Sequence, residues 1–195
     1  MIRGLGLLAR PLALAVLVSG IATLDLDVRD AVQRARNPAL EPVMRAVTNA
    51  TQPRNVFALM VGVAVFGGPA GPVLVREATA ALLPVNLVVE VLKRTVDRTR
   101  PDGSRDPNNA SFPSSHAANA CAIAVLVTRR WPRSGWIAWP LALLVCVSRM
   151  WLDRHYLTDV LAAAVIGAGI AWWVTRWARN AGRGWVESGR YPGGR

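Results

Sequence analysis

The chain has 195 residues, of which 52% are hydrophobic, and carries a formal net charge of +11. This length allows one domain, or one compact bundle of about six short membrane helices. The charges lie almost entirely between long uncharged blocks, a pattern that is typical of a membrane protein and argues against a soluble domain or a nucleic-acid binder. Nearly all the cations are arginines, which can simply reflect coding bias, so the single lysine, Lys93, stands out.

Six apolar segments follow one another along the chain and predict an all-α polytopic membrane bundle. They span residues 5–24, 56–75, 78–92, 114–128, 136–147 and 158–177, and Pro84 interrupts the third. The first segment could be a signal peptide, but it is longer than the usual apolar core of roughly 7–15 residues, which favours an uncleaved helix. Several segments are shorter than the roughly 20 residues of a full span, so we expect their helices to continue through polar residues into a shared solvated pocket.

Two longer connections separate these segments. Residues 25–55 have apolar positions at helical spacing, with breaks at Asn37-Pro38 and Gln52-Pro53. They predict two short amphipathic helices at the membrane interface that would roof the pocket, although a plain surface connector fits equally well. Residues 97–113 are polar and turn-rich, and predict a loop. We expect a single transmembrane domain over residues 1–180 and a flexible basic tail at residues 181–195.

The order of the helices predicts where the polar residues meet. With six crossings, the end of the third helix, the start of the fourth and the connection between the fifth and sixth lie on one membrane face. Basic residues are divided almost evenly between the two faces, so the positive-inside rule does not decide the orientation by itself. The inner loops are shorter and several outer cations have a chemical role, so we expect cytoplasmic termini and an active site on the outer face of a bacterial plasma membrane.

Three groups of unusual polar residues fall on that predicted face. They are Lys93 with Arg100 and Pro101; Ser114, Ser115 and His116 after Pro113; and Ser148 and Arg149 with His155 and Asp159. Lys93 and Arg100 are seven residues apart, which on one helix would place them on the same face about 10 Å apart. Together with Arg149 they could surround one phosphate. The Ser114 hydroxyl, and the amides near Ser115 where a helix begins, could also hold an anion.

The two histidines offer the means to break a phosphate ester. His155 and Asp159 are four residues apart and would be neighbours on a helix face. A carboxylate that accepts the Nδ1 proton leaves the Nε2 lone pair of His155 free to act as a nucleophile. His116 could protonate the departing alkoxide and later activate water. Three cations can neutralise the phosphate, so this chemistry requires neither a metal nor a cofactor.

Each of these residues also has a plainer interpretation. A basic pair at a membrane edge commonly anchors a helix, and a histidine at a helix end is often incidental. However, the chain has only two histidines and one lysine, and all three fall within the groups. Glu90 is interpreted as a structural counter-ion near Lys93. Asp97, Asp102 and Asp106 are interpreted as solvated loop charges, with a cation site as the alternative.

The three groups resemble the motifs K-x6-R-P, P-S-G-H and S-R-x5-H-x3-D of the type 2 phosphatidic acid phosphatase family, the phosphatase branch of the vanadium haloperoxidase superfamily. The first and third motifs match in full, and the match runs from Lys93 to Asp159. The resemblance implies phosphate binding by Lys93, Arg100, Ser114, Ser115 and Arg149, with His155 as nucleophile, His116 as general acid and Asp159 orienting His155. Ser115 replaces the glycine of the second motif, which would be costly if that position required a positive φ.

The sequence therefore predicts a metal-independent phosphatase of membrane lipids. Polyprenyl (di)phosphate, phosphatidylglycerophosphate and phosphatidate all fit as substrates. A vanadate-dependent haloperoxidase is one alternative, although such proteins are generally larger and soluble. A non-catalytic protein that binds or transports lipid phosphates is another, but binding alone would not need the two histidines. Gly167 and Gly169 allow close helix contacts within or between chains, so the oligomeric state is left open.

Overall fold

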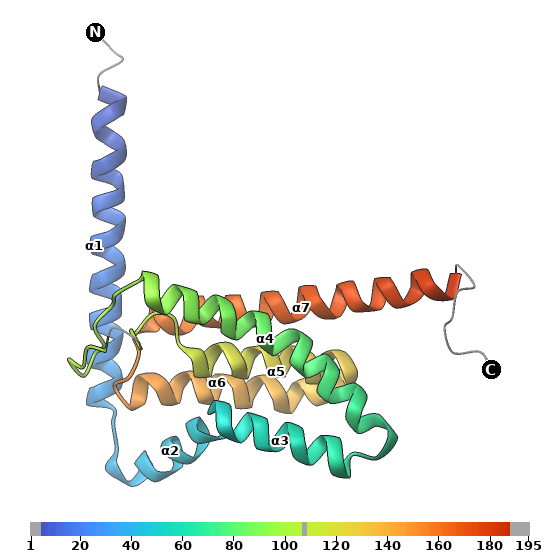
Figure 1. The fold of residues 1–195 in the computed structure, drawn as a ribbon. Coiled ribbons are helices and arrows are strands. Elements are labelled where there is room, and N and C mark those ends of the chain that lie inside the picture. Colours follow the sequence, from blue (N-terminus) through green and yellow to red (C-terminus); the bar gives the residue numbers. More distant parts are fainter. Residues whose placement is uncertain (1–4, 107–108, 188–195) are drawn as a thin grey trace.

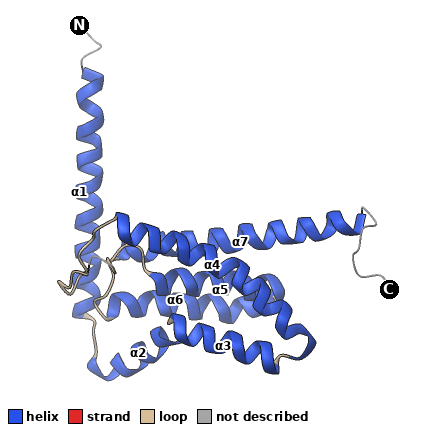
Figure 2. Cartoon of the chain, in the orientation of Figure 1, coloured by secondary structure: helices blue, strands red, loops and turns tan. Residues whose placement is uncertain are grey.

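The structure, a computed structural model, describes the backbone of residues 5–106 and 109–187, and the side chains of residues 19–177 apart from positions 53, 70, 107 and 108. Within these residues it consists of helices and loops without a strand, which confirms the predicted all-α class (Figure 2). The helices are α1 (Leu5–Arg34), α2 (Glu41–Ala50), α3 (Pro53–Phe66), α4 (Gly71–Thr95), α5 (Ser115–Arg130), α6 (Gly135–Trp151) and α7 (Leu157–Glu187). Short 3-10 turns at Pro38–Leu40, Gly68–Ala70 and Pro132–Ser134 join some of them.

Helix α5 lies at the centre of the bundle, and α4, α6 and α7 pack around it, while α3 packs on α4 (Figure 1). Small buried residues of α5 allow this close approach from several sides; they include Ala117, Ala118, Ala120, Ala122 and Ala124. Gly167 of α7 meets the backbone of α5, because a Cβ at this position would lie 2.1 Å from the carbonyl oxygen of Ala118. Gly169 has open space around its Cα. The contact at Gly167 is therefore made within one chain.

Apolar side chains cover much of the outside of this bundle, as expected for a protein surrounded by lipid. Phe57, Phe66, Trp136 and Leu143 are among the large exposed ones. Helix α4 and the Leu157–Trp177 part of α7 are long and apolar enough to cross a membrane, and no other helix meets both criteria within residues 19–177, whose side chains the structure describes. The count of six spanning helices therefore remains a prediction.

Helix α1 differs from its prediction in length. It continues to Arg34, so the first of the two expected amphipathic helices is the end of α1. The break comes only at Asn37-Pro38, where the Asn37 side chain accepts a hydrogen bond from the amide of Ala39. Helix α2 corresponds to the second expected amphipathic helix. Figure 1 shows that α1 meets the bundle near its C-terminal end and projects away from the other helices elsewhere.

The boundary between the second and third predicted helices was wrong. Helix α3 ends at Phe66, and α4 begins at Gly71, in the middle of the predicted segment 56–75. The cause is the sequence Gly67-Gly68-Pro69: Gly68 has φ +59, and a Cβ at Gly67 would lie 2.3 Å from the carbonyl oxygen of Val63. The predicted interruption at Pro84 is also absent, because α4 runs through it to Thr95.

Helix α7 also extends beyond its prediction, to Glu187, so the first residues of the expected tail are helical. The rest of that tail, residues 188–195, lies outside the described residues. Between α4 and α5 the described residues form a loop, as predicted. The C-terminal ends of α4 and α6 and the N-terminal ends of α5 and α7 meet at the end of the bundle nearest α1 (Figure 1). This is where the three groups of polar residues come together.

Candidate active site

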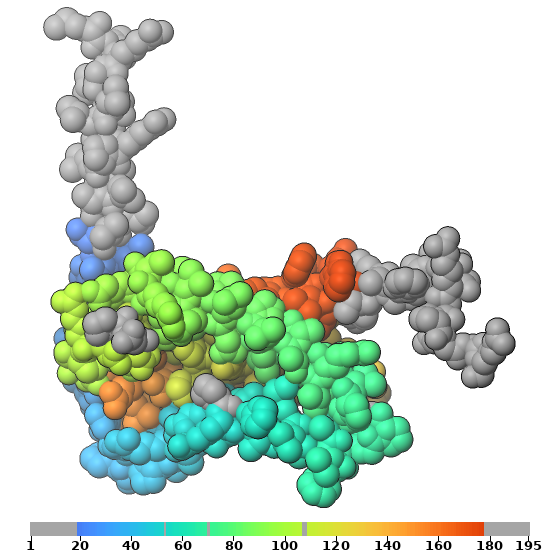
Figure 3. Space-filling model, viewed as in Figure 1, coloured from blue at the N-terminus to red at the C-terminus, as the bar shows by residue number. Residues whose placement is uncertain are grey.

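A cavity of about 760 Å³ opens at this end of the bundle. Its lining includes six of the predicted site residues, namely Lys93, Arg100, Ser115, His116, Arg149 and His155. Thr48 and Asn49 of α2 line the other side, so this helix covers part of the cavity as expected for a roof. In Figure 3 the yellow-green loop between α4 and α5 and the blue α2 segment frame the orange segment that leads to α7. Ser114 and Asp159 do not line the cavity.

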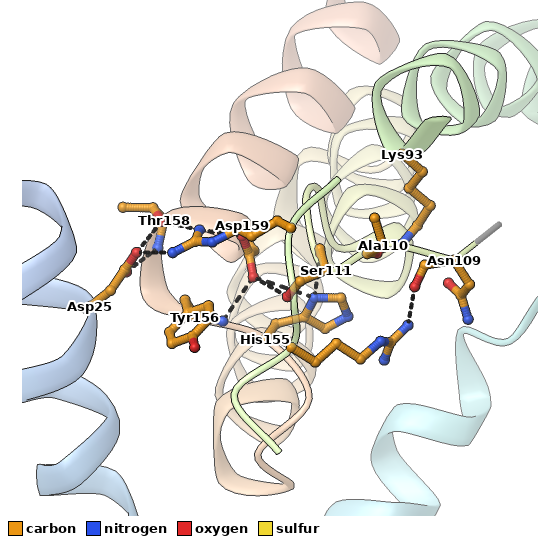
Figure 4. A network of polar contacts seen from close by, with 11 residues as sticks. Asp25, Lys93, Asn109, Ala110, Ser111, His155, Tyr156, Thr158 and Asp159 are labelled. Carbon is orange, nitrogen blue, oxygen red and sulfur yellow. Dashed lines mark hydrogen bonds and ion pairs between the residues drawn. The ribbon is translucent and has the colours of Figure 1, made fainter. Parts of the chain in front are cut away.

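His155 lies in the short connection between α6 and α7 and is buried. Its Nδ1 is 2.8 Å from the carbonyl oxygen of Ser111, which can only accept a hydrogen bond (Figure 4). Nδ1 must therefore carry the proton, and Nε2 carries the lone pair. Burial lowers the pKa of His155 to about 4, although the neighbouring Asp159 acts in the opposite direction. The ring is thus held in the neutral form that a nucleophile needs.

Asp159 lies just beyond hydrogen-bond distance of His155, with Oδ2 at 3.7 Å from Nδ1. Instead, Oδ2 accepts hydrogen bonds from the Ser111 hydroxyl at 2.6 Å and the Tyr156 amide at 2.9 Å (Figure 4). The carboxylate therefore holds the same residue, Ser111, whose carbonyl orients the imidazole. His155 and Asp159 do not share a helix face as predicted, because α7 begins only at Leu157 and His155 lies before it.

A buried charge network continues from Asp159 to α1. Arg98 donates to Asp159 Oδ1 at 2.5 Å and to Asp25 Oδ2 at 2.6 Å. Asp25 also accepts from the amide and the hydroxyl of Thr158. The guanidinium of Arg98 lies 4.3 Å from the ring centroid of Tyr156. Arg98 thus joins the loop, α1 and α7 through two carboxylates.

The three predicted phosphate-binding cations point their polar atoms toward uncharged oxygens. Lys93 Nζ donates to the carbonyl of Ala110 at 2.5 Å, and Arg100 Nη2 to the carbonyl of Asn109 at 3.2 Å. Arg149 Nη1 donates to the Thr48 hydroxyl at 2.8 Å. Among the described residues, none of the three has a carboxylate within ion-pair distance. Their positive charges are therefore left for another anion.

Lys93 and Arg100 are brought together differently from the prediction. Because α4 ends at Thr95, Arg100 does not share a helix face with Lys93. It sits in a turn, where its amide donates to Ser104 and its carbonyl accepts from the amide of Gly103, which has φ +80. Burial lowers the pKa of Arg100 below its ordinary value, and the nearby positive charge of Arg154 acts in the same direction.

The residues around the start of α5 contribute unequally. Ser114 is the N-cap, its amide donates to the Asp159 carbonyl at 3.2 Å, and its hydroxyl is buried without a hydrogen-bond partner. Ser115 is the first helical residue; in the described part of the chain only Asp153 among the non-glycine residues has a positive φ. The glycine-to-serine difference at position 115 therefore introduces no left-handed backbone. Nε2 of His116 is buried and unpartnered.

Several other charged residues around the cavity form ion pairs. Arg36 and Arg45 both bind Glu41, each at 2.6 Å. Arg154 binds Asp102 at 2.8 Å. Asp97 pairs with Arg105. Glu90 was predicted to be a counter-ion near Lys93, but it pairs with Arg94 instead. These pairs give Asp97 and Asp102 structural roles. Among the described residues, Lys93, Arg100 and Arg149 are the cations that line the cavity without an ion-pair partner.

The model of the PAP2 superfamily matches residues 74–183 of the chain, which include all three groups. The chain belongs to the PAP2 superfamily. A curated relative, phosphatidylglycerophosphatase B of Bacillus subtilis, is 29% identical over 80% of this chain and 84% of its own length. Undecaprenyl-diphosphatase BcrC of the same organism is 40% identical over 30% of each chain. A crystal structure of a transmembrane PAP2-type phosphatidylglycerolphosphate phosphatase from Bacillus subtilis covers 92% of this chain and 98% of its own, with a TM-score of 0.69 and 24% identity.

Membership of the PAP2 superfamily confirms the resemblance stated from the motifs. The chain is accordingly an enzyme of the lipid phosphatase class, and a membrane protein like its relatives. The structural likeness extends this agreement to the fold of most of the chain, including residues before position 74 that the PAP2 model does not match.

Four residues at this PAP2 site were missed from the sequence: Asp25, Thr48, Arg98 and Ser111. Ser111 contacts His155 through its backbone carbonyl, which every residue type has, so the sequence gives no sign of this contact. Arg98 resembles any solvated loop charge until its two carboxylate partners are known. Asp25 carried a usable signal, because a carboxylate directly after a long apolar segment is costly unless it is paired. Thr48 lies on the predicted amphipathic helix but gives no comparable signal.

Proposed function

We propose that the chain hydrolyses a lipid phosphate monoester or diphosphate through a covalent phosphohistidine on His155. The observation that carries the proposal is the trio of cations without carboxylate partners, around a cavity that also holds both histidines. A phosphate between these side chains would be neutralised by Lys93, Arg100 and Arg149. Charge that develops on its oxygens in the transition state would be stabilised by the same groups.

Two chemical steps follow from this arrangement. Nε2 of His155 attacks phosphorus and the bond to the leaving oxygen breaks, while protonated His116 gives a proton to that oxygen. The leaving group is the lipid alcohol of a monoester or the lipid phosphate of a diphosphate. His116 then takes a proton from water, the water oxygen attacks phosphorus, and the P–N bond breaks to release inorganic phosphate. Asp159 and Ser111 hold His155 with Nδ1 protonated throughout. The Ser114 hydroxyl and the Ser115 amide are proposed to assist in binding phosphate oxygens.

The proposed substrates are lipids with a terminal phosphate or diphosphate: polyprenyl (di)phosphate, phosphatidylglycerophosphate or phosphatidate. The names of the two Bacillus relatives, phosphatidylglycerophosphatase B and undecaprenyl-diphosphatase BcrC, support the second and the first of these. Because three cations supply the positive charge that a metal would otherwise provide, turnover is proposed to be independent of metal ions. The active site is proposed to face the outside of the membrane.

The test is phosphate release from a panel of these lipids by purified protein in detergent, with excess chelator. We expect His155→Ala to lower turnover by at least about 10³-fold and to form no acid-labile phosphoenzyme. We expect His116→Ala to slow turnover about 10²–10⁴-fold and to accumulate phosphoenzyme with a substrate that has a good leaving group. No release from any lipid, with wild type and His155→Ala alike, would favour a binding or transport protein, whereas vanadate-dependent halide oxidation would favour the haloperoxidase alternative.

A further inference from the structure

Two adjoining hollows lie at the end of the bundle opposite the candidate active site. The first, of about 400 Å³, is lined by residues of α4, α5 and α7. The second, of about 190 Å³, lies mainly between α3, α4 and α5. Glu77, Leu126 and Arg130 line both hollows, so one opens beside the other. One hollow is basic and the other is apolar.

The first hollow is basic. Arg76, Arg129 and Arg130 line it, with Glu77 as the one carboxylate, so three positive charges against one negative leave a surplus of two. Of the ion pairs found in the described parts of the chain, none involves these arginines. Nε of Arg129 is buried without a hydrogen-bond partner, and its guanidinium lies 5.9 Å from the ring centroid of Trp172. An anion in this hollow would meet uncompensated guanidinium groups.

The second hollow is apolar. Apart from Glu77 and Arg130, its lining consists of aliphatic side chains together with Met60 and Trp131. Trp131 is half exposed, and tryptophan side chains favour the level of the lipid headgroups. The apolar hollow therefore begins where a lipid headgroup would lie and runs along helices that face the acyl chains.

This region is well separated from the candidate active site. Arg76 and Lys93 are 17 residues apart on α4, which corresponds to about 25 Å along the helix axis. Arg129 and Arg130 are the last two residues of α5, and His116 lies in its first turn. The chain has only two histidines, and both belong to the candidate active site. A ligand in the two hollows would be bound without being cleaved.

We propose that the two hollows form a second lipid site, which binds an anionic phospholipid as a stabilising ligand. The phosphate would contact Arg76, Arg129 and Arg130, and one acyl chain would lie in the apolar hollow. Charge complementarity identifies the occupant, because the arginines favour an anionic headgroup over a zwitterionic one, and the adjoining hollow favours a lipid over free phosphate. The proposal requires insertion in a membrane but does not depend on the proposed catalysis.

The test compares lipid binding by the full chain in a non-ionic detergent. Phosphatidylglycerol and phosphatidylcholine with the same acyl chains are titrated, and the thermal unfolding midpoint is followed to obtain an apparent Kd for each. The variant is Arg76→Gln with Arg130→Gln. Arg133→Gln is the matched control, because Arg133 is exposed, lies three residues after Arg130 and lines neither hollow. Arg100→Gln controls for binding at the candidate active site, and inorganic phosphate replaces lipid in a further arm.

We expect wild type, Arg133→Gln and Arg100→Gln to bind phosphatidylglycerol at least tenfold more tightly than phosphatidylcholine, and the double variant to lose this preference. Equal affinity for both lipids, or a preference that survives in the double variant, would overturn the proposal. If Arg100→Gln alone removed the preference, the lipid would be bound in the candidate active site instead. If inorganic phosphate reproduced the full arginine-dependent shift, the hollow would be an anion site without a role for the acyl chain.

Discussion

At the scale of single residues, His155 is controlled by two features that act in the same direction. The carbonyl of Ser111 requires a proton on Nδ1, and burial disfavours a second proton on the ring. The imidazole is therefore neutral at physiological pH, with the lone pair on Nε2. An unburied histidine would be partly protonated at pH 6 and would lose that fraction of its nucleophile.

This arrangement predicts an unusually low acid limb for the first chemical step. Because burial lowers the pKa of His155 to about 4, the nucleophile is lost only as the pH falls through about 4, and not near the ordinary value of 6.5. Rapid-quench measurement of phosphoenzyme formation between pH 4 and 8 checks this, with the ionisation of the substrate phosphate measured separately. A limb near pH 6.5 that the substrate does not explain would contradict it.

Residue types at fixed spacing were enough to identify the groups that meet in the cavity, but not the contacts between them. Lys93, His116, Arg149 and His155 all line it as the motifs implied. The link between Asp159 and His155 could not be predicted, because it passes through the backbone and side chain of Ser111, 44 residues before His155. Pattern reasoning locates side chains along a helix, whereas a loop residue that folds back onto the site has no periodic position.

At the scale of elements, α1 is tied to the site by charged groups near its C-terminal end. Asp25 binds Arg98 and Thr158, and Arg29 forms two hydrogen bonds with Asp153. Since Arg98 also binds Asp159, a change in α1 reaches the residue that holds Ser111. Helix α1 therefore supports the proposed nucleophile, His155, from outside the central bundle.

Removing the carboxylate of Asp25 is expected to damage both stability and catalysis. Asp25→Ala leaves Arg98 with one of its two carboxylates and should cost roughly 3 kcal/mol of unfolding free energy, because Asp25 is buried and Arg98 is only partly exposed. It should also lower kcat more than it raises KM, because the cavity residues proposed to bind phosphate remain. Denaturant titration and steady-state kinetics test both effects. Asp27→Ala, at an exposed position on the same helix, should change neither.

The two glycines of α7 give a second, paired prediction. Gly167→Ala would place a Cβ 2.1 Å from the Ala118 carbonyl oxygen, so α5 and α7 must separate, at a cost of about 1–3 kcal/mol. Gly169→Ala has open space and should be neutral or slightly stabilising. Because Ala118 follows His116 by two residues, Gly167→Ala should also reduce turnover. Unfolding midpoints of the two variants measured side by side would contradict this packing if they were equal.

The helices themselves were predicted with uneven success for physical reasons. The long apolar segments were enough to predict membrane helices, because a segment in lipid must satisfy its backbone hydrogen bonds internally and a helix does so. Their ends failed where local backbone chemistry decided them, as at Gly67-Gly68, or where a helix continued through polar residues, as α1 does beyond Asp25. Pro84 was predicted to interrupt its helix, but α4 continues through it because the neighbouring helices pack against α4 on both sides of the proline.

At the scale of the whole molecule, the proposed orientation places the loop between α4 and α5 outside the cell and the turn between α5 and α6 inside. Single cysteines at Ser104 and Arg133, both exposed, report on these two sides. The background is Cys121→Ala with Cys146→Ala, which removes both natural thiols. An impermeant maleimide applied to intact cells should label the first position and reach the second only after lysis. Labelling in the reverse order would place the active site in the cytoplasm.

The positive charges of Lys93, Arg100 and Arg149, which are proposed to serve activity, are also expected to lower the stability of the fold. Three cations that line one cavity without ion-pair partners repel one another, and Lys93 is buried as well, so we expect the enzyme without bound phosphate to be less stable than its packing alone would allow. Lys93→Met should therefore raise the unfolding midpoint while activity is lost, and added inorganic phosphate should raise the midpoint of wild type more than that of the variant. A lower midpoint in Lys93→Met would mean that the lysine stabilises the fold. On this proposal, the resting enzyme carries a charge repulsion that a bound phosphate relieves.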